Sequence, residues 1–263
     1  MTPLGALLWT AVCHGLFLSI AHGLSLVRGS LDIVTLGAVQ AFVYLLGILL
    51  MLRVYEPGVP LRQSLGLRPT DASLGLLGMG LGVCLKLPAE SLTNVVERMY
   101  PTSEAQLLGR AALYRTDTLG QVLGLLLVLC LAGPLVEELF FRGASYGRLV
   151  KAGSKVAALV SGGAFVVVHS DMRHWPALVI VAAVLSYLRF AGGSLLPCLG
   201  LHVTFNASGV LALVTGAASP TRPLDVPMVP LFASWLGAGV LLGLVRRQVH
   251  SPDVLRARAE DRT

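Results

Sequence analysis

The chain is a succession of long apolar runs separated by short polar breaks. A helix needs roughly 20 apolar residues to cross the hydrocarbon core of a bilayer, and runs near that length recur throughout. The pattern predicts an all-α polytopic membrane protein with about eight transmembrane helices. Seven is the alternative count, because two of the runs are short. The predicted spans are 5–26, 33–53, 73–88, 119–141, 156–170, 175–191, 194–216 and 228–245.

The spans divide the chain into three parts. Residues 1–118 hold three helices and a long polar loop, 119–216 hold the central helices, and 217–263 hold the last helix and a basic tail. The first span has no preceding positive charge and no small-residue cleavage site, so we expect it to be retained as a helix. Apolar residues at helical spacing in the loop 89–118 predict an amphipathic helix on the membrane surface. A plain connector is the alternative.

Composition supports a membrane protein, since 55% of the residues are hydrophobic, 13% are charged and the mean hydropathy is +0.76. A soluble domain carries about a quarter of its residues as charges. With a cytoplasmic N-terminus, 13 of the 20 basic residues fall in cytoplasmic loops and in the tail, as the positive-inside rule requires. Both termini are therefore predicted to be cytoplasmic. The net charge of +6 follows this topology, and no nucleic-acid partner is predicted.

Cysteine usage and residue choice add two expectations. The four cysteines lie in four different apolar runs without a C-x-x-C pair, which is typical of small buried hydrophobic residues; they are Cys13, Cys84, Cys130 and Cys198. The chain has 17 Arg against 3 Lys and is rich in Ala, Gly and Leu. This bias indicates a GC-rich bacterial genome, and hence the bacterial cytoplasmic (inner) membrane as the location.

Two adjacent carboxylates, Glu137 and Glu138, end an otherwise nearly uncharged run. An ionisable residue at the centre of a membrane helix costs about 2.5–3.5 kcal/mol on insertion scales, so a tandem pair requires a reason. Glu138 and Arg142 are four residues apart on one helical face and can pair. Glu137 points about 100° away and is left free to exchange a proton. The alternative is that both mark the lipid–water interface.

Two further polar pairs occur at helical spacing. "FVVVH" ends at His169, near the end of its span, and "HVTFN" places His202 and Asn206 on one face. His169 could instead be a hydrogen-bonded packing residue, and His202 with Asn206 could join helices by polar contacts. Taken with the glutamates and Arg142, these residues supply a base, two imidazoles and an amide donor. Such a set can activate water and stabilise an oxyanion. His14, His22 and Lys86 are interpreted as packing residues.

The three motifs resemble those of a known family. "EELFFR" fits E-E-x-x-x-R, "FVVVH" fits F-x-x-x-H and "HVTFN" fits H-x-x-x-N, in this order and within apolar spans. They are similar to the motifs of the CPBP intramembrane proteases, which include the type II CAAX prenyl endopeptidases and the bacterial Abi proteins. The resemblance covers roughly residues 119–215. It implies an all-helical membrane peptidase with a polar catalytic cluster inside the bundle, and makes 119–216 the catalytic part.

The resemblance also implies a role for each candidate residue. Glu137 would activate water with the help of His169, Glu138 and Arg142 would support the site, and His202 with Asn206 would hold the oxyanion. The two helices could bring Glu137 to His169 only if the first continued past Arg142 to about residue 150. The partners implied are the lipid bilayer and a membrane-associated protein or peptide substrate. In a bacterium, processing of membrane-anchored or exported proteins is favoured over prenylated substrates.

The need for a metal stays open at this point. The family is often described as metalloprotease, and Glu137, His169 and His202 are the candidate ligands for zinc. No H-E-x-x-H motif is present, so a zincin site is not supported, and no cofactor is predicted. Two other functions remain as alternatives: a proton-coupled membrane transporter, and a non-catalytic bacteriocin-immunity or scaffold protein.

Overall fold

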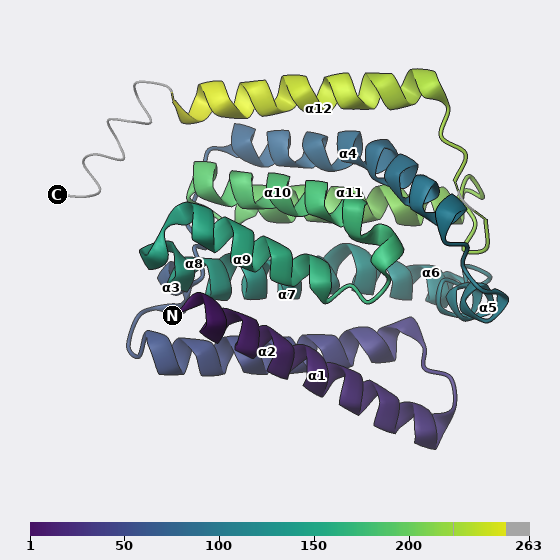
Figure 1. Ribbon diagram of the computed structural model, residues 1–263, viewed down its shortest axis with the longest axis horizontal. Helices are drawn as coiled ribbons and strands as arrows, with labels where there is room; N and C mark the ends of the chain where they lie inside the picture. The colour runs from purple at the N-terminus through teal and green to yellow at the C-terminus, as the bar shows by residue number, and fades with distance from the viewer. Residues whose placement is uncertain (223, 251–263) are drawn as a thin grey trace.

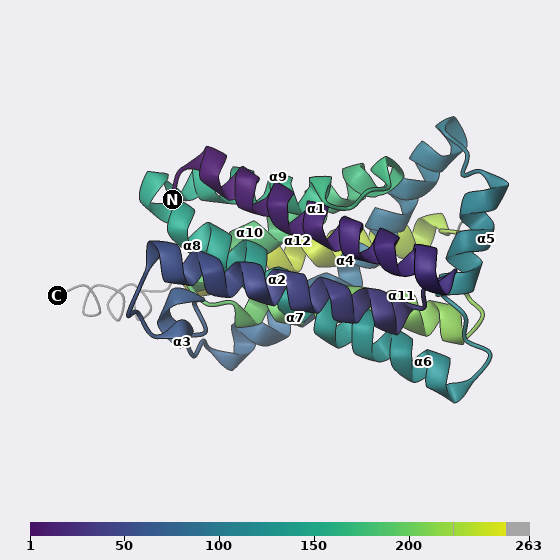
Figure 2. The ribbon, with the colours of Figure 1, turned by 90° about the horizontal axis from the view of Figure 1, so that it is seen from below.

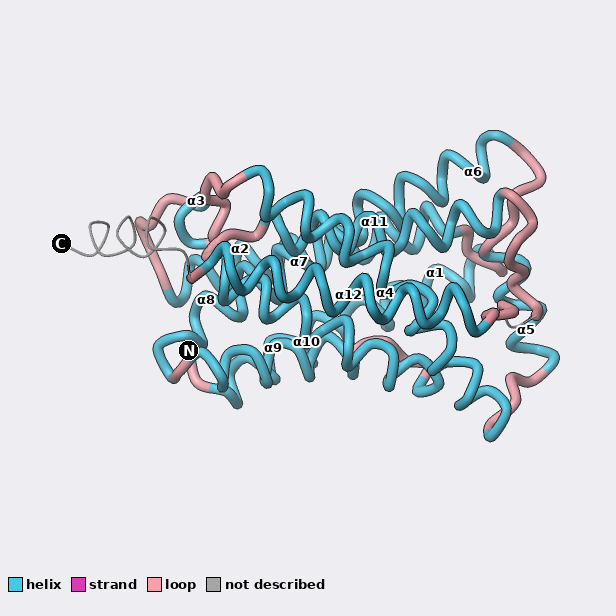
Figure 3. Tube along the Cα trace, turned by 90° about the horizontal axis from the view of Figure 1, so that it is seen from above, coloured by secondary structure: helices cyan, strands magenta, loops and turns pink. Residues whose placement is uncertain are grey.

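The computed structural model describes residues 1–222 and 224–250 as a bundle of helices that run side by side (Figure 1). Loops gather at the two ends of the bundle (Figure 3). The helices are α1 (Pro3–Arg28), α2 (Ile33–Tyr55), α3 (Leu61–Ser64), α4 (Ala72–Met99), α5 (Glu104–Leu113), α6 (Leu119–Leu125), η1 (Leu126–Ala132), α7 (Gly133–Glu138), η2 (Leu139–Ser145), α8 (Tyr146–Leu149), η3 (Val150–Ala152), α9 (Ser154–Val167), η4 (Met172–His174), α10 (Trp175–Gly192), α11 (Leu196–Val214) and α12 (Met228–Val249). Within this described part there is no strand, so the all-α prediction is confirmed. The predicted basic tail beyond residue 250 lies outside the described residues.

Seven helices of the described chain are long and apolar enough to cross a membrane: Pro3–Arg28, Ile33–Tyr55, Ala72–Met99, Leu119–Ala152, Met172–Gly192, Leu196–Val214 and Met228–Val249. The fifth of the eight predicted spans, 156–170, is the shorter apolar helix α9. α9 runs back across the bundle, and the end of α12 therefore lies at the same end as the N-terminus (Figure 1). We call this the N-terminal end and the other, where α5 lies, the α5 end. The protein is an integral, all-α polytopic membrane protein.

The third helix is longer than its sequence predicts. We expected the span to end at Pro88, but α4 continues for three more turns because it buries Ala89 and Thr93 against the bundle. A proline is tolerated where neighbouring helices hold the backbone in place. The polar loop 89–118 is correspondingly shorter than predicted. Its separate helix, α5, starts at a capping box and has no buried residue, and it lies across the end of the bundle in Figure 2.

Close packing of α4 against α11 fixes the position of the last motif. A Cβ atom on Gly78 would collide with the carbonyl of Pro197, and one on Gly82 with the carbonyl of Leu201. Small residues spaced by four let two membrane helices approach until their backbones touch. This contact sets both the depth and the rotation of α11. It therefore places His202, the next residue after Leu201, inside the bundle.

Candidate active site

One continuous helix, Leu119–Ala152, carries both glutamates near its midpoint. Within it two π-helical stretches, η1 and η2, lie on either side of α7, which ends at Glu138. π-Helical turns are rare and frequently occur at functional sites. The helix continues well past Arg142 and ends at Ala152. The expectation that this helix reaches about residue 150, which Glu137 needs in order to lie near His169, is therefore confirmed.

A side chain from α11 completes the hydrogen bonding of the first π-helical stretch. The N–H of Gly133 donates to Val128, five residues back, so the carbonyl of Leu129 would next need the N–H of residue 134. That residue is Pro134, which has no N–H. Asn206 supplies the missing donor, with Nδ2 at 2.7 Å from the Leu129 oxygen. Asn206 thus ties α11 to the helix that bears the glutamates, and it uses one of its two amide N–H donors to do so.

Glu138 is the fully buried centre of a charged cluster. Arg142 Nη1 lies 3.2 Å from Glu138 Oε1, and neither side chain is exposed. His202 Nδ1 lies 2.9 Å from the same oxygen, and the Arg142 guanidinium lies over the ring of Phe165 at 4.4 Å from its centroid. A buried carboxylate is stable when cations pair with it and donate hydrogen bonds to it. The pairing of Glu138 with Arg142 expected from the sequence is therefore present.

Glu137 has different partners, and both come from other helices. Gln40 Nε2, on α2, donates to Glu137 Oε1 at 2.8 Å. On its other side Glu137 Oε2 faces His202 Nε2 at 3.8 Å, too far for a direct hydrogen bond. The side chain of Glu137 is 13% exposed, against 0% for Glu138. Gln40 is absent from the sequence-based site, although a lone amide within the apolar run 33–53 is a signal that could have found it.

His169 lies beside this cluster without a direct hydrogen bond to the glutamates. Its Nδ1 lies 2.7 Å from the carbonyl oxygen of Phe165, and a carbonyl only accepts, so Nδ1 carries a proton. In the neutral ring Nε2 is then the free acceptor. The Phe165 ring contacts both imidazoles, with centroid distances of 4.7 Å to the His169 ring and 5.8 Å to the His202 ring. Trp175 Nε1 donates to the His169 carbonyl at 2.8 Å and fixes the end of this segment.

A third imidazole, His14 on α1, also lies near the site. It lies close enough to His169 for the two rings to interact electrostatically. Its Nδ1 is buried and has no hydrogen-bond partner among the described residues. Spacing and composition do not separate His14 from His22, since both are single histidines in the first apolar run. The fold brings only His14 near the candidate site.

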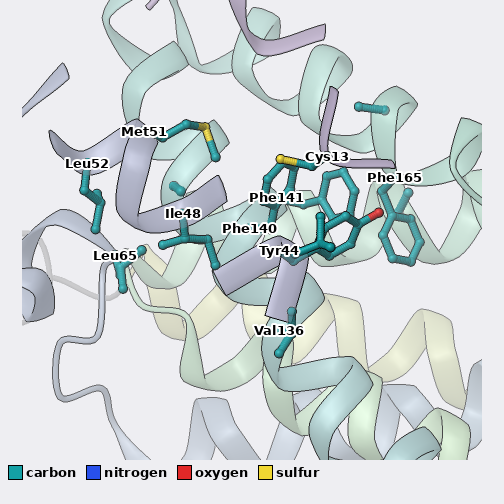
Figure 4. Packing of buried hydrophobic residues seen from close by; sticks show 14 of the residues in the cluster. Cys13, Tyr44, Ile48, Met51, Leu52, Leu65, Val136, Phe140, Phe141 and Phe165 are labelled. Carbon is teal, nitrogen blue, oxygen red and sulfur yellow. The ribbon is translucent and has the colours of Figure 1, made fainter. Parts of the chain in front are cut away.

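Aromatic rings pack together in the core (Figure 4), and the Arg142 guanidinium lies over one of them, Phe165. Tyr44 stacks on Phe140 with a centroid distance of 4.8 Å, and Phe141 meets Phe140 edge-on at 5.0 Å. Phe165 continues this packing at 5.5 Å from Phe141. All four rings are almost completely buried. Water is excluded from this side of the site, which strengthens the interactions between the charged groups.

A polar cavity of about 350 Å³ approaches the site from the α5 end. Its inner wall includes Asn206 and Leu129, so it reaches within one turn of α11 from His202. Lys86 and Glu90 also line it and pair with each other at 2.6 Å. Among the candidate catalytic residues only Asn206 lines this cavity.

Salt bridges hold the mouth of this cavity in shape. Arg110 of α5 binds Glu97 at 3.0 Å and Asp171 at 2.6 Å, and Arg173 binds Asp171 at 2.7 Å. Burial raises the pKa of Asp171, but the hydrogen bonds from Arg173 and Arg110 more than offset this and lower it to about 2. Asp171 is therefore ionised over the physiological pH range and can pair with Arg110 of α5 throughout it.

The three candidate metal ligands do not converge. Within residues 1–222 and 224–250, no group of three or more His, Cys, Asp or Glu side chains is arranged to hold a metal ion. His202 Nδ1 is engaged by Glu138, Glu137 Oε1 by Gln40, and His169 Nδ1 by the carbonyl oxygen of Phe165. The residues as arranged do not fit a zinc site with three protein ligands.

The fold and the site together define a class: an all-α membrane protein with a buried cluster of carboxylates, imidazoles, an arginine and amides. Residues 119–208 match the family model described as Rce1-like, type II CAAX prenyl endopeptidase Rce1-like. The match covers about a third of the chain and confirms the resemblance to the CPBP family. At the level of this family, the matched segment corresponds to a membrane protease, which is a hydrolase. Comparison with curated proteins found no match, and comparison with solved structures found none.

Proposed function

We propose that the protein is an intramembrane endopeptidase of the glutamate type, in which Glu137 is the base that activates water. The observation that carries the proposal is the unequal treatment of the two glutamates. Glu138 is fully buried and paired with Arg142 and His202. Glu137 is oriented by the neutral amide of Gln40 and keeps its other carboxylate oxygen turned toward His202. A carboxylate held in place but without a cation bound directly to it is suited to accept a proton.

In the proposed reaction Glu137 takes one proton from a water molecule while the water oxygen bonds to the peptide carbonyl carbon. The carbonyl oxygen becomes an oxyanion. His202, as an imidazolium, donates Nδ1–H to Glu138 and Nε2–H to that oxyanion. The C–N bond then breaks and the proton passes from Glu137 to the leaving nitrogen. The products are a carboxylic acid and an amine, and Glu137 returns to its ionised form.

The other motif residues assist this pair. Asn206 has a second amide N–H beyond the one bound to Leu129, and we assign it to the oxyanion together with His202. His169 presents Nε2 as an acceptor because Nδ1 is fixed on the Phe165 carbonyl, which suits it to help Glu137 move the proton. Arg142 pairs with Glu138 and fixes its carboxylate beside His202, where it can stabilise positive charge on the imidazole.

The substrate we propose is a membrane-anchored or exported protein of a bacterium, cut near the membrane. The positive-inside distribution of the loops supports a cytoplasmic N-terminal end, and the polar cavity lies at the α5 end, which would then face outward. Water and the substrate chain would then reach the site from the external side of the inner membrane. This direction of entry supports exported proteins over cytoplasmic ones as substrates.

The test is comparative membrane proteomics of the host. A strain lacking the gene is complemented with the wild-type chain, with Glu137→Ala, or with Glu104→Ala as a matched control, since Glu104 is an exposed carboxylate on α5. We expect uncut precursors to accumulate with Glu137→Ala and not with Glu104→Ala. Complete restoration of processing by Glu137→Ala would refute the assignment. Loss of a solute flux without any uncut precursor would instead indicate a transporter. If cells carrying Glu137→Ala were still protected against a bacteriocin, the protein would instead be an immunity or scaffold protein.

A further inference from the structure

A second polar cavity, of about 780 Å³, lies at the N-terminal end of the bundle. Figure 2 shows α3 and α8 at this end, beside the N-terminus and away from α5. The walls come from the ends of α2, α8 and α10 and from the segment around α3. None of the candidate catalytic residues lines it. The cavity is therefore separate from the candidate active site, and its role does not depend on the proposed peptidase chemistry.

The lining of this cavity favours an anion. Three cationic side chains reach it, namely Arg68, Lys151 and Arg189. The carboxylate that lines it, Glu56, is already bound at 2.7 Å by the buried Arg148. Its charge is thereby neutralised, and the three remaining cations leave the cavity strongly positive. Clustered basic residues at a cytoplasmic membrane surface attract anionic headgroups by about 1 kcal/mol each.

Two residues that line the same cavity carry buried hydroxyl groups without hydrogen-bond partners. Tyr146 is 3% exposed and Ser64 is 8% exposed, and neither side-chain oxygen has a hydrogen-bond partner among the described residues. Buried polar atoms are nearly always hydrogen-bonded, so two unsatisfied donors on one cavity wall point to an acceptor from outside the chain. Phosphate oxygens accept from hydroxyl, guanidinium and ammonium donors alike.

An apolar groove of about 590 Å³ continues directly from this cavity. It runs between α9 and α10, and the two share Ser154 and Phe190 as lining residues. Along α9 it extends from Ser154 to Val167, a rise of about 20 Å in a helix. Half of the hydrocarbon core of a bilayer is about 15 Å thick. The groove is therefore long enough to receive an acyl chain across one leaflet.

We propose that this cavity and groove form a binding site for one anionic glycerophospholipid. The phosphate lies among Arg68, Lys151 and Arg189 and accepts from Tyr146 and Ser64, and one acyl chain lies in the groove between α9 and α10. A soluble anion would use the basic cavity alone, and only a lipid explains its continuation into an apolar groove of acyl-chain length. Arg189 Nε also donates to the backbone carbonyl of Arg142 at 2.9 Å, so the headgroup site adjoins the helix that carries the glutamates.

The test is native mass spectrometry of the full chain with dioleoyl phosphatidylglycerol, dioleoyl phosphatidylcholine, or glycerol 3-phosphate as the headgroup alone. We expect phosphatidylglycerol to bind at least tenfold more tightly than phosphatidylcholine. The double variant Arg68→Gln/Lys151→Gln should reduce that preference roughly tenfold or more, because each cation contributes about fivefold. The matched control is Arg53→Gln/Arg246→Gln, two exposed arginines at the same end that do not line the cavity.

A second pair of variants tests the groove. A side chain added at Gly163 meets nothing within 4 Å and projects into the groove, and Gly243 on α12 is equally open but lies elsewhere. Gly163→Leu should weaken phosphatidylglycerol binding at least fivefold, and Gly243→Leu should leave it unchanged. Equal binding of the two lipids by the wild type would overturn the proposal. An equal loss of phosphatidylglycerol binding in Arg68→Gln/Lys151→Gln and in Arg53→Gln/Arg246→Gln would also overturn it. If glycerol 3-phosphate bound tightly and Gly163→Leu did not change its affinity, the ligand would be a soluble anion, and the lipid proposal would be overturned.

Discussion

Gln40 Nε2 donates a hydrogen bond of 2.8 Å to Glu137 Oε1, across 97 residues of sequence and between two helices of the bundle. The bond fixes one carboxylate oxygen and leaves the other turned toward His202. A neutral amide orients the carboxylate without cancelling its charge. Arg142 performs a different task for the neighbouring Glu138, because a guanidinium both orients a carboxylate and neutralises it.

The first prediction is that Gln40→Leu lowers kcat about tenfold and leaves KM nearly unchanged. Leucine fills the space of the amide but cannot hold Glu137 in its orientation, and a hydrogen bond to a charged group contributes about 1.5–3 kcal/mol. The measurement is steady-state cleavage of a substrate identified by the proteomic comparison. Phe42→Leu, at an exposed position on the same helix, is the control. A raised KM at constant kcat would show that Gln40 contacts substrate and does not position the base.

The second prediction separates the two glutamates. Glu137→Gln should abolish measurable turnover, with a loss of at least about a hundredfold, while the unfolding temperature changes little. Arg142→Ala should reduce both, because it leaves Glu138 buried without its cation at a cost of about 3–5 kcal/mol. Cleavage assays and thermal unfolding of the purified variants measure the two effects. Normal cleavage by Glu137→Gln, or an Arg142→Ala protein of undiminished stability, would contradict this division of roles.

The sequence could predict the helices and the Glu138–Arg142 pair because both follow from local periodicity. Spans show as apolar runs, and residues four apart share a helical face. The bond from Gln40 could not be predicted, since nothing in an apolar run tells which neighbour its single amide will meet. Asn206 is a similar case. Its hydrogen bond to Leu129 depends on a π-helical turn and on Pro134, and the register of that turn is set by packing and not by spacing.

The third prediction concerns orientation in the membrane. A reporter fused after residue 263 should be active in the cytoplasm, and one inserted near Glu104 should be active outside. The reason is the excess of basic residues in the loops assigned to the cytoplasm. The measurement uses two reporters at each position: an enzyme that is active only outside the cytoplasm, and a fluorescent protein that is active only inside it. Reversed signals would turn the polar cavity of the α5 end toward the cytoplasm.

The fourth prediction is a loss of stability in acid that depends on Asp171. Its pKa falls from 3.8 to about 2 on folding, so its contribution is fully present above pH 3.8 and is lost as the pH falls toward 2. Between pH 5 and about pH 2 the unfolding temperature of the wild type should therefore fall more steeply than that of Asp171→Asn. Thermal unfolding of the purified proteins measures this. Asp117→Asn is the control, because Asp117 has an exposed ion pair with Arg115 and should follow the wild-type curve.

The last prediction is that catalysis does not require a metal. A zinc ion held by Glu137, His169 and His202 would have to compete with the hydrogen-bond partners of these side chains, which are Gln40, the Phe165 carbonyl and Glu138 in turn. A Glu137 carboxylate bound to zinc could not at the same time act as the base. His202 and Asn206 are better explained as donors to the oxyanion, so His202→Ala and Asn206→Ala should each lower kcat about tenfold or more with little change in KM.

Elemental analysis of the purified, active protein tests this directly, with activity measured before and after a strong chelator. We expect zinc well below one equivalent and activity unchanged by the chelator. Stoichiometric zinc, with activity lost on its removal and restored on its return, would make both histidines ligands. In that case the three side chains would have to leave their present hydrogen-bond partners to bind the metal before the protein could cut.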